Sequence, residues 1–494
     1  MRVSMLCVLA LLIYPTLAAS SHSRLIVVAF DSFRYDFPHV FPGIVTPTFD
    51  KISQEGARVK GSRPVLMTNS WPNWLSLASG LWPESHQVVD NSFYDPEFDK
   101  WFNLAIRADP RYYDMGAEPI WITNQRQACS QRQAAGDQRH AGDQRQAGDQ
   151  RQAGDQRQAA GDQRSGDCEN PRSSGAVFYP GAEAPFSGMK ADRFVTPYNE
   201  LLDYRRRIDI LMSWITDPVR PINLGMLYID NPDHVAHEFG PESNQTRDMV
   251  ELLDNLTATL FDKLQQEGLL DSTNILFIGD HGHAPGPDKL ISANDYGVDS
   301  SMFESYSPRS HSTAQLYPKK EYEEFVYERL STIPNITVYR KAEVPERYHY
   351  NNTRRMVSMV LIADEGFKLD IGPKSRTDVP QRASGRGSHQ MDPFNDKAAS
   401  IFWAYGPAFK QGFYRDEFIY HVDVYQLMCH LLELKPAPNN GTWAHVRDML
   451  NVDPTSTLST TTEGASAVLA HYWIFGLNLL VCLLALQHTH GDIY

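Results

Sequence analysis

The sequence predicts an α/β fold with a mainly parallel central sheet and helices on both faces. Two observations indicate it. Short apolar runs rich in β-branched residues alternate with segments whose apolar residues recur at three- and four-residue spacing. Three of these runs, VVAF, GMLYI and NILFIG, each end at a carboxylate or an imidazole. In open α/β sheets, ligand sites form at the carboxyl ends of the strands.

The elements follow in order along the chain. The spacing predicts a strand at VVAF, helices over 48–55 and 71–80, a helix over 204–215, a strand at GMLYI, a helix over 248–267, and strands at NILFIG and SIFWAYG. A last helix is expected over 422–432. Gly268 is typical of a helix C-terminus and ends the helix before it. Strands that alternate with helices in this way favour parallel pairing.

A repeat interrupts this pattern at 131–167, where RQAAGDQ and RQAGDQ recur with almost no apolar residue. Such a segment buries too little apolar surface to offset the entropy of ordering, so we expect a disordered surface insertion. Cys129 and Cys168 flank it, and a disulfide between them would close the loop. The remainder of 22–452 is expected to form one catalytic domain.

Both ends of the chain have the character of targeting segments. Residues 1–19 are typical of a cleaved signal peptide. Residues 465–486 are apolar and long enough to span a bilayer, after a Ser/Thr-rich stalk over 453–464 and before a short tail over 487–494. We expect a single-pass type I protein at the cell surface with its catalytic domain outside. A lipid (GPI) anchor is the alternative, because small residues precede the apolar run.

Glycosylation motifs and net charge bear on location and partners. Sequons of the type N-x-S/T occur at Asn244, Asn255, Asn335, Asn351 and Asn440, as expected for an extracellular domain. The net charge of −14 argues against a nucleic-acid-binding surface. It does not exclude an anionic small-molecule substrate, because bound metal ions reverse the local field.

A set of residues suited to binding zinc is spread along the chain, mostly in strand-to-loop contexts: Asp31, Asp233, His237, Asp280, His281 and His389. Imidazole and carboxylate are the usual ligands of a catalytic zinc. Asp280 and His281 are adjacent, which requires a sharply turned backbone that Gly282 permits. Asp233 and His237 are four apart, within reach of one metal on a helical turn.

Ser70 is the candidate nucleophile, because a metal ion can favour its alkoxide form. The alternative is that Ser70 only caps the following helix. Asn91 could donate a hydrogen bond to a phosphate oxygen on which charge builds in the transition state. The alternative for Asn91 is an ordinary turn residue.

The chain resembles the ectonucleotide pyrophosphatase/phosphodiesterases of the alkaline-phosphatase superfamily, and most closely their single-domain, membrane-anchored members. The resemblance rests on blocks such as VVAFDSFRYD, TNSWPNWLSLASGLWPESH, NLGMLYIDNPDHVAHEFGP and GDHGH. It implies an alkaline-phosphatase-like fold and two Zn²⁺ ions. Asp31, Ser70, Asp280 and His281 would hold one ion; the other would be held by Asp233, His237 and His389. Ser70 would form a covalent ester that water then hydrolyses.

The sequence departs from the family pattern at several positions. Serine stands at position 70 where most relatives have threonine, and the hydroxyl is retained. The other departures are Trp74 for histidine, Ala236 for glycine, His283 where methionine is common, and Gln390 and Pro393 in the block after His389. The metal ligands survive these changes, whereas specificity and rate are open to alteration.

The resemblance also bears on the substrate. Trp71 and Tyr198 match aromatic residues that stack on a nucleotide base, and Lys100 is a candidate contact to a further phosphate. We therefore expect hydrolysis of pyrophosphate-linked nucleotides such as NAD or dinucleoside polyphosphates, with release of nucleoside 5′-monophosphates. The alternatives are a choline-phosphodiester or lysophospholipid hydrolase, a catalytically weak cell-surface binding protein, and a phosphomonoesterase.

Overall fold

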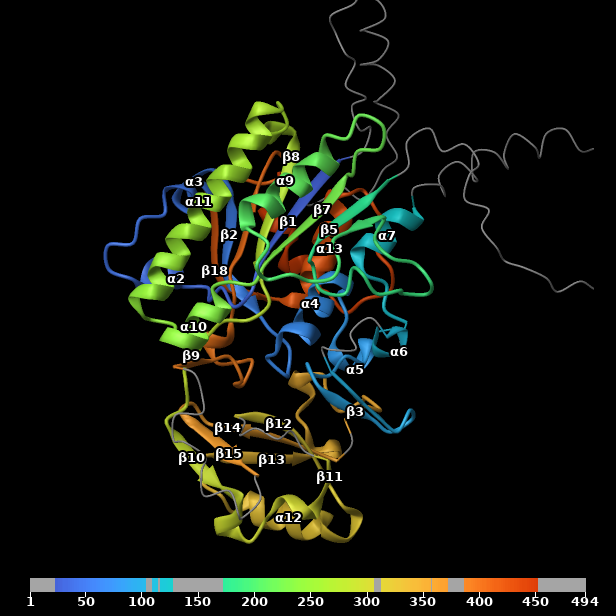
Figure 1. The fold of residues 1–494 in the computed structure, drawn as a ribbon, viewed down its shortest axis with the longest axis vertical. Helices are drawn as coiled ribbons and strands as arrows, with labels where there is room; N and C mark the ends of the chain where they lie inside the picture. The colour runs from blue at the N-terminus through green and yellow to red at the C-terminus, as the bar shows by residue number, and fades with distance from the viewer. Residues whose placement is uncertain are drawn as a thin grey trace, which may run out of the picture. The chain divides into compact units, whose positions relative to one another are not determined.

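A central sheet of eight strands, in the order β18-β2-β17-β8-β1-β7-β5-β6, dominates the described part of the chain (Figure 1). Its pairs are parallel except those of β17, which is antiparallel to both neighbours. The predicted α/β class with a mainly parallel sheet is therefore confirmed. The computed structural model describes residues 23–103, 109–113, 116–127, 172–305, 312–356, 358–371 and 386–451. These residues belong to one compact unit.

The strands of the central sheet are β1 Arg24–Phe30, β2 Ala57–Arg63, β5 Ser174–Val177, β6 Arg193–Phe194, β7 Leu224–Ile229, β8 Thr273–Gly279, β17 Phe402–Tyr405 and β18 Phe413–Tyr420. The α-helices are α2 Phe37–Val40, α3 Pro47–Glu55, α4 Ser70–Ser79, α5 Pro83–His86, α6 Pro110–Tyr113, α7 Ile120–Arg126, α9 Tyr204–Ile215, α10 Asp233–Phe239, α11 Asn244–Gln266, α12 Glu323–Ser331 and α13 His421–Leu431.

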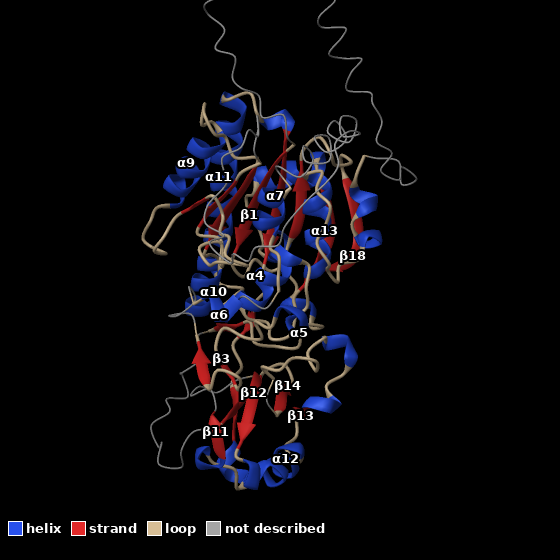
Figure 2. Cartoon of the chain, turned by 90° about the vertical axis from the view of Figure 1, so that its right-hand side faces the viewer, coloured by secondary structure: helices blue, strands red, loops and turns tan. Residues whose placement is uncertain are grey.

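Both faces of the central sheet are buried. Along β1, Leu25 and Val27 belong to one apolar core, whereas Ile26 and Val28 belong to the other. This alternation follows from the two-residue period of a strand. The core on one face is closed by α4, α7 and α13, and the core on the other by α3, α9 and α11 (Figure 1); Figure 2 shows the same sheet from the side of α7 and α13. A strand covered on both faces is apolar at successive positions, and for this reason the sequence VVAF predicts a strand.

A second sheet, which the sequence did not predict, lies within 303–363. It is antiparallel, with the order β11 Phe303–Ser305, β12 Thr313–Pro318, β14 Met359–Ala363 and β13 Ile336–Arg340. Helix α12 packs against β13. Beside this sheet, β10 Lys289–Ser292 pairs with β15 Phe367–Asp370. The predicted single catalytic domain thus carries a smaller antiparallel layer with its own apolar core.

Two short ladders complete the described structure. One is the hairpin of β3 Phe93–Asp95 and β4 Lys100–Phe102. The other pairs β9 Ala284–Pro285 with β16 Gly387–Ser388. This second ladder matters for the site, because it fastens the chain just before His389 to the chain just after His283.

The described residues contain no helix that is long and apolar enough to cross a membrane. The predictions for 1–19, for the repeat over 131–167 with Cys129 and Cys168, and for 453–494 all lie outside the described residues.

Candidate active site

Three neighbouring strands bring the predicted carboxylates to one edge of the central sheet. Asp31 directly follows β1, Asp280 directly follows β8, and Asp233 begins α10 just after β7. Because β8, β1 and β7 are adjacent and parallel, their carboxyl ends meet at the same edge. The backbone N–H of Asp233 donates to the carbonyl of Asp31 over 3.1 Å, which fixes the two segments together.

The first cluster consists of Asp31, Asp280 and His281, all buried, with ligand-type atoms within 4.8 Å of one another. Nε2 of His281 lies 3.1 Å from Oδ2 of Asp280 and 3.8 Å from Oδ1 of Asp31. Two neighbours orient the carboxylates. The hydroxyl of Tyr228 donates to Oδ2 of Asp31 over 2.5 Å, and the backbone N–H of Ser32 donates to Oδ1 of Asp280 over 2.9 Å.

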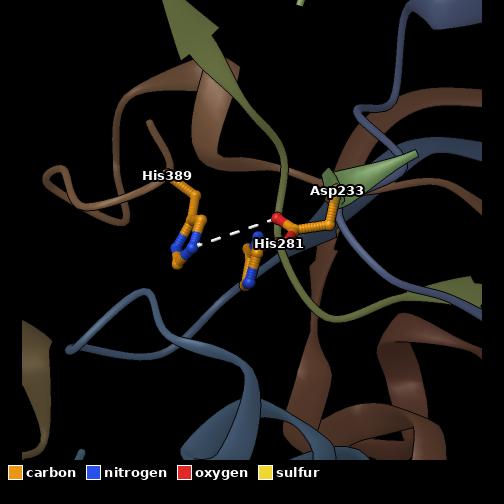
Figure 3. Close-up of side chains that lie close together, drawn as sticks. All are labelled: Asp233, His281 and His389. Carbon is orange, nitrogen blue, oxygen red and sulfur yellow. Dashed lines mark ion pairs between the residues drawn. The ribbon is translucent and has the colours of Figure 1, made fainter. Parts of the chain in front are cut away.

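The second cluster gathers around Oδ1 of Asp233. Nε2 of His237, one turn along α10, lies 3.3 Å from this oxygen. Nε2 of His389 lies 4.0 Å from it, and Figure 3 shows this pair together with His281. The ring of His281 stacks on that of His389 at 3.9 Å, so His281 borders both clusters. A further imidazole, that of His283, also approaches Asp233.

The three predicted histidine ligands share one hydrogen-bonding pattern. Nδ1 of His237 donates to the carbonyl of Gly387, Nδ1 of His389 to that of Thr68, and Nδ1 of His281 to that of Gly282. A carbonyl can only accept, so each Nδ1 is protonated, and in the neutral ring the lone pair is on Nε2. Metal-binding histidines are held by such second partners.

Three buried carboxylate oxygens have no hydrogen-bond partner: Oδ1 of Asp31, Oδ1 of Asp233 and Oδ2 of Asp280. Buried polar atoms are otherwise nearly always paired, so each unpaired oxygen needs an explanation. Burial, together with the charges of Asp280 and Asp233, raises the pKa of Asp31 well above its usual value. Divalent cations would pair these oxygens and remove the repulsion. The donor set therefore fits metal ions.

Ser70 is the first residue of α4, with Asn69 at the N-cap position, so Ser70 does not itself cap the helix. Its Oγ lies 3.4 Å from Nε2 of His281. Asn91 accepts a hydrogen bond from the backbone N–H of Trp71 through Oδ1, at 2.9 Å. The amide group of Asn91 that remains available is thus the donor Nδ2, as the predicted role requires.

A cavity of about 280 Å³ opens beside Ser70. Its lining includes Ser70, Asn91, Trp71 and Tyr198, together with Asp31, Asp233 and His389 from the clusters. The ring of Trp71 packs on Tyr112 and Tyr113, and the hydroxyl of Tyr198 donates to Asp230 over 2.8 Å. Both predicted stacking residues therefore line one cavity, and neighbouring side chains hold each of them in place.

Lys100 is placed differently. It lies on β4, where its ammonium is 3.2 Å from Oδ2 of Asp109, and it is not among the residues that line the cavity. The structure thus brings together the predicted residues apart from Lys100, which is already engaged in an ion pair.

Several residues around the site were not identified from the sequence. Phe178 and Glu183 line the cavity, and Tyr228 orients Asp31. Oδ1 of Asp90 accepts from Nδ2 of Asn69 over 2.5 Å and from the backbone N–H of Asn91 over 2.7 Å. Loss of hydration raises the pKa of Asp90 to about 6. Only the adjacency of Asp90 to Asn91 could have signalled this role.

The role assigned to Gly282 needs a correction. The φ of Gly282 is not positive, so the glycine does not adopt the left-handed backbone conformation that a sharp turn would need. A Cβ at this position would instead lie 2.1 Å from the carbonyl oxygen of Lys397 and 2.6 Å from that of Ala399. Glycine is required because another backbone segment passes close to it.

The fold and the site together define a class. A mainly parallel α/β sheet bears carboxylate and imidazole clusters at its strand ends, beside a serine hydroxyl and a cavity. This combination is typical of hydrolases that use metal ions to cleave phosphate esters.

Comparison with known proteins specifies the family. The chain matches the family described as type I phosphodiesterase / nucleotide pyrophosphatase over residues 25–392. It therefore belongs to this family, and it is a phosphodiester hydrolase of the nucleotide pyrophosphatase type. The alkaline-phosphatase-like fold implied by the sequence is confirmed by its solved relatives.

Two curated relatives and one solved structure illustrate the similarity. A mouse bis(5′-adenosyl)-triphosphatase is 31% identical over 433 residues, covering 87% of this chain and 82% of that protein. The human ectonucleotide pyrophosphatase/phosphodiesterase family member 5 is 31% identical over 433 residues, covering 87% and 78%. An inactive variant of its murine counterpart, in complex with AMP, superposes with a TM-score of 0.71 at 30% identity, covering 87% and 100%.

Proposed function

We propose that this chain is an extracellular, zinc-dependent nucleotide pyrophosphatase/phosphodiesterase that releases nucleoside 5′-monophosphates from pyrophosphate-linked nucleotides such as NAD and dinucleoside polyphosphates. One observation carries the proposal. Oγ of Ser70 lies 3.4 Å from Nε2 of His281, which borders both clusters, and Ser70 lines the same cavity as Trp71 and Tyr198. The bis(5′-adenosyl)-triphosphatase relative and the AMP-bound relative support a nucleotide substrate.

The proposed cofactor is a pair of Zn²⁺ ions. Asp31, Ser70, Asp280 and His281 would hold the first ion; the second would lie among Asp233, His237 and His389. When bound, the ions supply charge stabilisation for the phosphate oxygens and lower the pKa of the attacking hydroxyl. The carboxylate oxygens without a hydrogen-bond partner support this assignment. The hydrogen bonds of the three Nδ1 atoms also support it, because they leave Nε2 as the ligand atom of each neutral ring.

The residues of the chain act in two steps. Oγ of Ser70 loses its proton to solvent and forms a bond to phosphorus while the bond to the leaving phosphate breaks, which gives a nucleotidyl-serine ester. Water then attacks the same phosphorus, the Ser70 ester bond breaks, and the hydroxyl regains a proton. Ser70 is at the first position of α4, where the positive end of the helix dipole favours the alkoxide. Nδ2 of Asn91 is positioned to donate to a phosphate oxygen.

The base of the nucleotide would lie between the two aromatic side chains. Trp71 is held by two tyrosines and Tyr198 by Asp230, so neither ring needs much ordering on binding. Base–aromatic stacking contributes about 1–3 kcal/mol per base and tolerates different bases. This favours a broad range of nucleotides. Lys100 would have to exchange its ion pair with Asp109 to reach a further phosphate.

The proposed location is the cell surface, with residues 22–452 as the extracellular catalytic domain, 453–464 as a stalk, and 465–486 as a membrane or GPI anchor. All five sequon asparagines are exposed, as glycosylation requires: Asn244, Asn255, Asn335, Asn351 and Asn440. The proposed partners are small-molecule phosphodiesters, with no nucleic acid.

A choline-phosphodiester substrate is the second candidate, and one observation favours it. Glu183 lines the cavity together with Phe178 and Tyr198. A carboxylate beside aromatic rings can bind a trimethylammonium group. The same cavity therefore offers a site for a choline head group as well as for a base.

Hydrolysis of a substrate panel by the purified full-length protein distinguishes these functions. The panel comprises NAD, diadenosine triphosphate, p-nitrophenyl thymidine monophosphate and p-nitrophenyl phosphorylcholine, with Ser70→Ala as the control. Cleavage of the nucleotides that needs Ser70 and is stopped by a chelator would support the proposal. Preference for the choline ester would move the assignment to the second candidate. Binding of zinc without any turnover would favour a binding protein.

A further inference from the structure

His283 brings an additional imidazole to the second cluster. Its side chain is fully buried, and its ring lies 4.5 Å from that of His237. Nδ1 of His283 is 3.7 Å from Oδ1 of Asp233. The ligand-type atoms of Asp233, His237 and His283 all lie within 4.8 Å of one another.

The distances around Asp233 suit a shared cation. Nitrogen atoms of His237, His283 and His389 lie 3.3, 3.7 and 4.0 Å from the same Oδ1. Zinc–ligand bonds of about 2.0–2.2 Å place any two ligand atoms of one ion at most about 4.2 Å apart. The three separations from Oδ1 of Asp233 fall within that limit; the atoms of His237 and His283 also lie close to each other, whereas His389 groups with Asp233 and His281. The oxygen at their centre has no hydrogen-bond partner.

His283 differs from the buried histidines that only support the fold. In His86, Nε2 contacts Oγ of Ser76 at 2.9 Å and Nδ1 accepts from the N–H of Val88. In His421, both ring nitrogens also have partners. In His283, Nε2 is buried and has none. Hydrogen bonding within the fold therefore engages only Nδ1 of His283, through Oγ of Ser32.

The partner of Nδ1 can be exchanged. Oγ of Ser32 lies 2.6 Å from Nδ1 of His283, but it also lies 3.1 Å from the carbonyl oxygen of Gly282. The hydroxyl can turn its proton to that carbonyl. A cation could then replace Ser32 at Nδ1, and the serine would remain hydrogen-bonded.

We propose that His283 is a further ligand residue of the second metal site, which then offers one carboxylate and three imidazoles. The inference rests on the two-metal site of the proposed function and goes beyond it. A donor set rich in imidazole favours zinc over magnesium, calcium or manganese. Four protein ligands also approach the number in structural zinc sites. The second ion should consequently be held more tightly than it would be by Asp233, His237 and His389 alone.

Metal binding by His283→Leu tests the proposal, with His86→Leu as a matched control in which a buried histidine outside the clusters is replaced. Zinc affinities are measured on the full-length protein by competition with a chromophoric chelator, and the visible spectrum is recorded with Co²⁺. Loss of even an outer partner of a ligand costs about 10–100-fold in affinity. We expect at least a ten-fold weaker zinc affinity at the second metal site and an altered Co²⁺ spectrum for His283→Leu, with His86→Leu like the wild type.

Unchanged zinc affinities and an unchanged Co²⁺ spectrum in His283→Leu would overturn the proposal. If that variant does not fold, His283→Gln keeps the side-chain size with a much poorer ligand and is read in the same way. A wild-type chain that binds a single ion would also overturn it. Turnover by such a chain that still required Ser70 would leave the hydrolase assignment standing, so the two failures are distinguishable.

Discussion

Ser70 is fixed through the residues on either side of it. Asn69 donates to Oδ1 of Asp90, and the N–H of Trp71 donates to Asn91. Because Asp90 also accepts from the backbone of Asn91, one carboxylate joins the segment that carries the nucleophile to the segment that carries the proposed phosphate donor. The position of Oγ relative to Nδ2 of Asn91 then depends on Asp90, which is not among the residues that line the cavity.

Removal of this carboxylate is expected to lower kcat more than it raises KM. In Asp90→Ala, Asn69 and Asn91 lose their common acceptor, so Oγ of Ser70 and Nδ2 of Asn91 are no longer held in a fixed relative position. Small misplacements of reacting groups cost about 10–100-fold in rate. Steady-state kinetics with diadenosine triphosphate measure the effect. Asp90→Asn keeps an acceptor oxygen and should retain most of the activity, and equal kinetics for Asp90→Ala and wild type would refute the positioning role.

At the scale of elements, the site depends on how closely segments approach each other. The turn after β8 passes against 397–399, and the N–H of Gly282 donates to the carbonyl of Ala398 over 2.6 Å. The ladder of β9 with β16 then brings His389 alongside. Ligand residues from distant parts of the sequence lie close together because these backbone segments pack directly against each other.

Gly282→Ala is expected to damage both stability and metal binding. The added methyl group would collide with two carbonyl oxygens, and overpacking of this kind costs about 1–3 kcal/mol. Gly268→Ala is the comparison: it has open space and a φ of +66°, so only the backbone strain of about 1 kcal/mol is expected. Urea unfolding and zinc content measure the two effects. A Gly282→Ala protein with full zinc content would contradict the account.

The elements that carry the ligands could be predicted because their strands are buried on both faces. Strands β1, β7 and β8 are continuous apolar runs, and the helix over 204–215 was predicted with its observed limits. Helix α11 begins at Asn244, earlier than the predicted 248, because Ser243 accepts from the N–H of Thr246 as its cap. Strand β2, ARVKGSR, is half polar, and the strands within 303–363 are short, so their patterns gave no comparable signal.

The candidate ligand residues could be predicted from their residue type and their position after strands. Which of them share a cluster could not be predicted. His281 borders both clusters, and His283 joins the second, because β9, β16 and the turn at Gly282 fold the imidazoles together. The supporting roles of Tyr228 and Asp90 depend on contacts between residues far apart in the sequence. Single-sequence reasoning contains no information about such contacts.

For the molecule as a whole, buried neutral histidines make stability depend on pH. Burial and the charge of Arg355 lower the pKa of His86 to about 3. In the unfolded chain, His86 has the ordinary histidine pKa of about 6.5, so it binds a proton at higher pH than in the folded chain. This contribution to stability is complete above about pH 6.5 and is lost as the pH falls toward 3.

Between about pH 8 and pH 5, His86 alone should account for about 2 kcal/mol of lost unfolding free energy. His86→Leu cannot take up this proton. Its unfolding free energy should be lower than that of wild type at pH 8, because Ser76 and Val88 lose a partner, but should fall about 2 kcal/mol less on acidification. Urea denaturation at both pH values measures the difference. Equal losses in the two proteins would show that His86 is not held neutral.

The central claim is that two metal ions at the ends of β1, β7 and β8 enable Ser70 to cleave a nucleotide phosphodiester. Titration of zinc into the metal-free full-length protein, with release of AMP from diadenosine triphosphate as the readout, tests it most directly. The account predicts that activity rises until about two equivalents are bound and is missing throughout in Ser70→Ala. Full activity without added metal, or undiminished activity in Ser70→Ala, would contradict it.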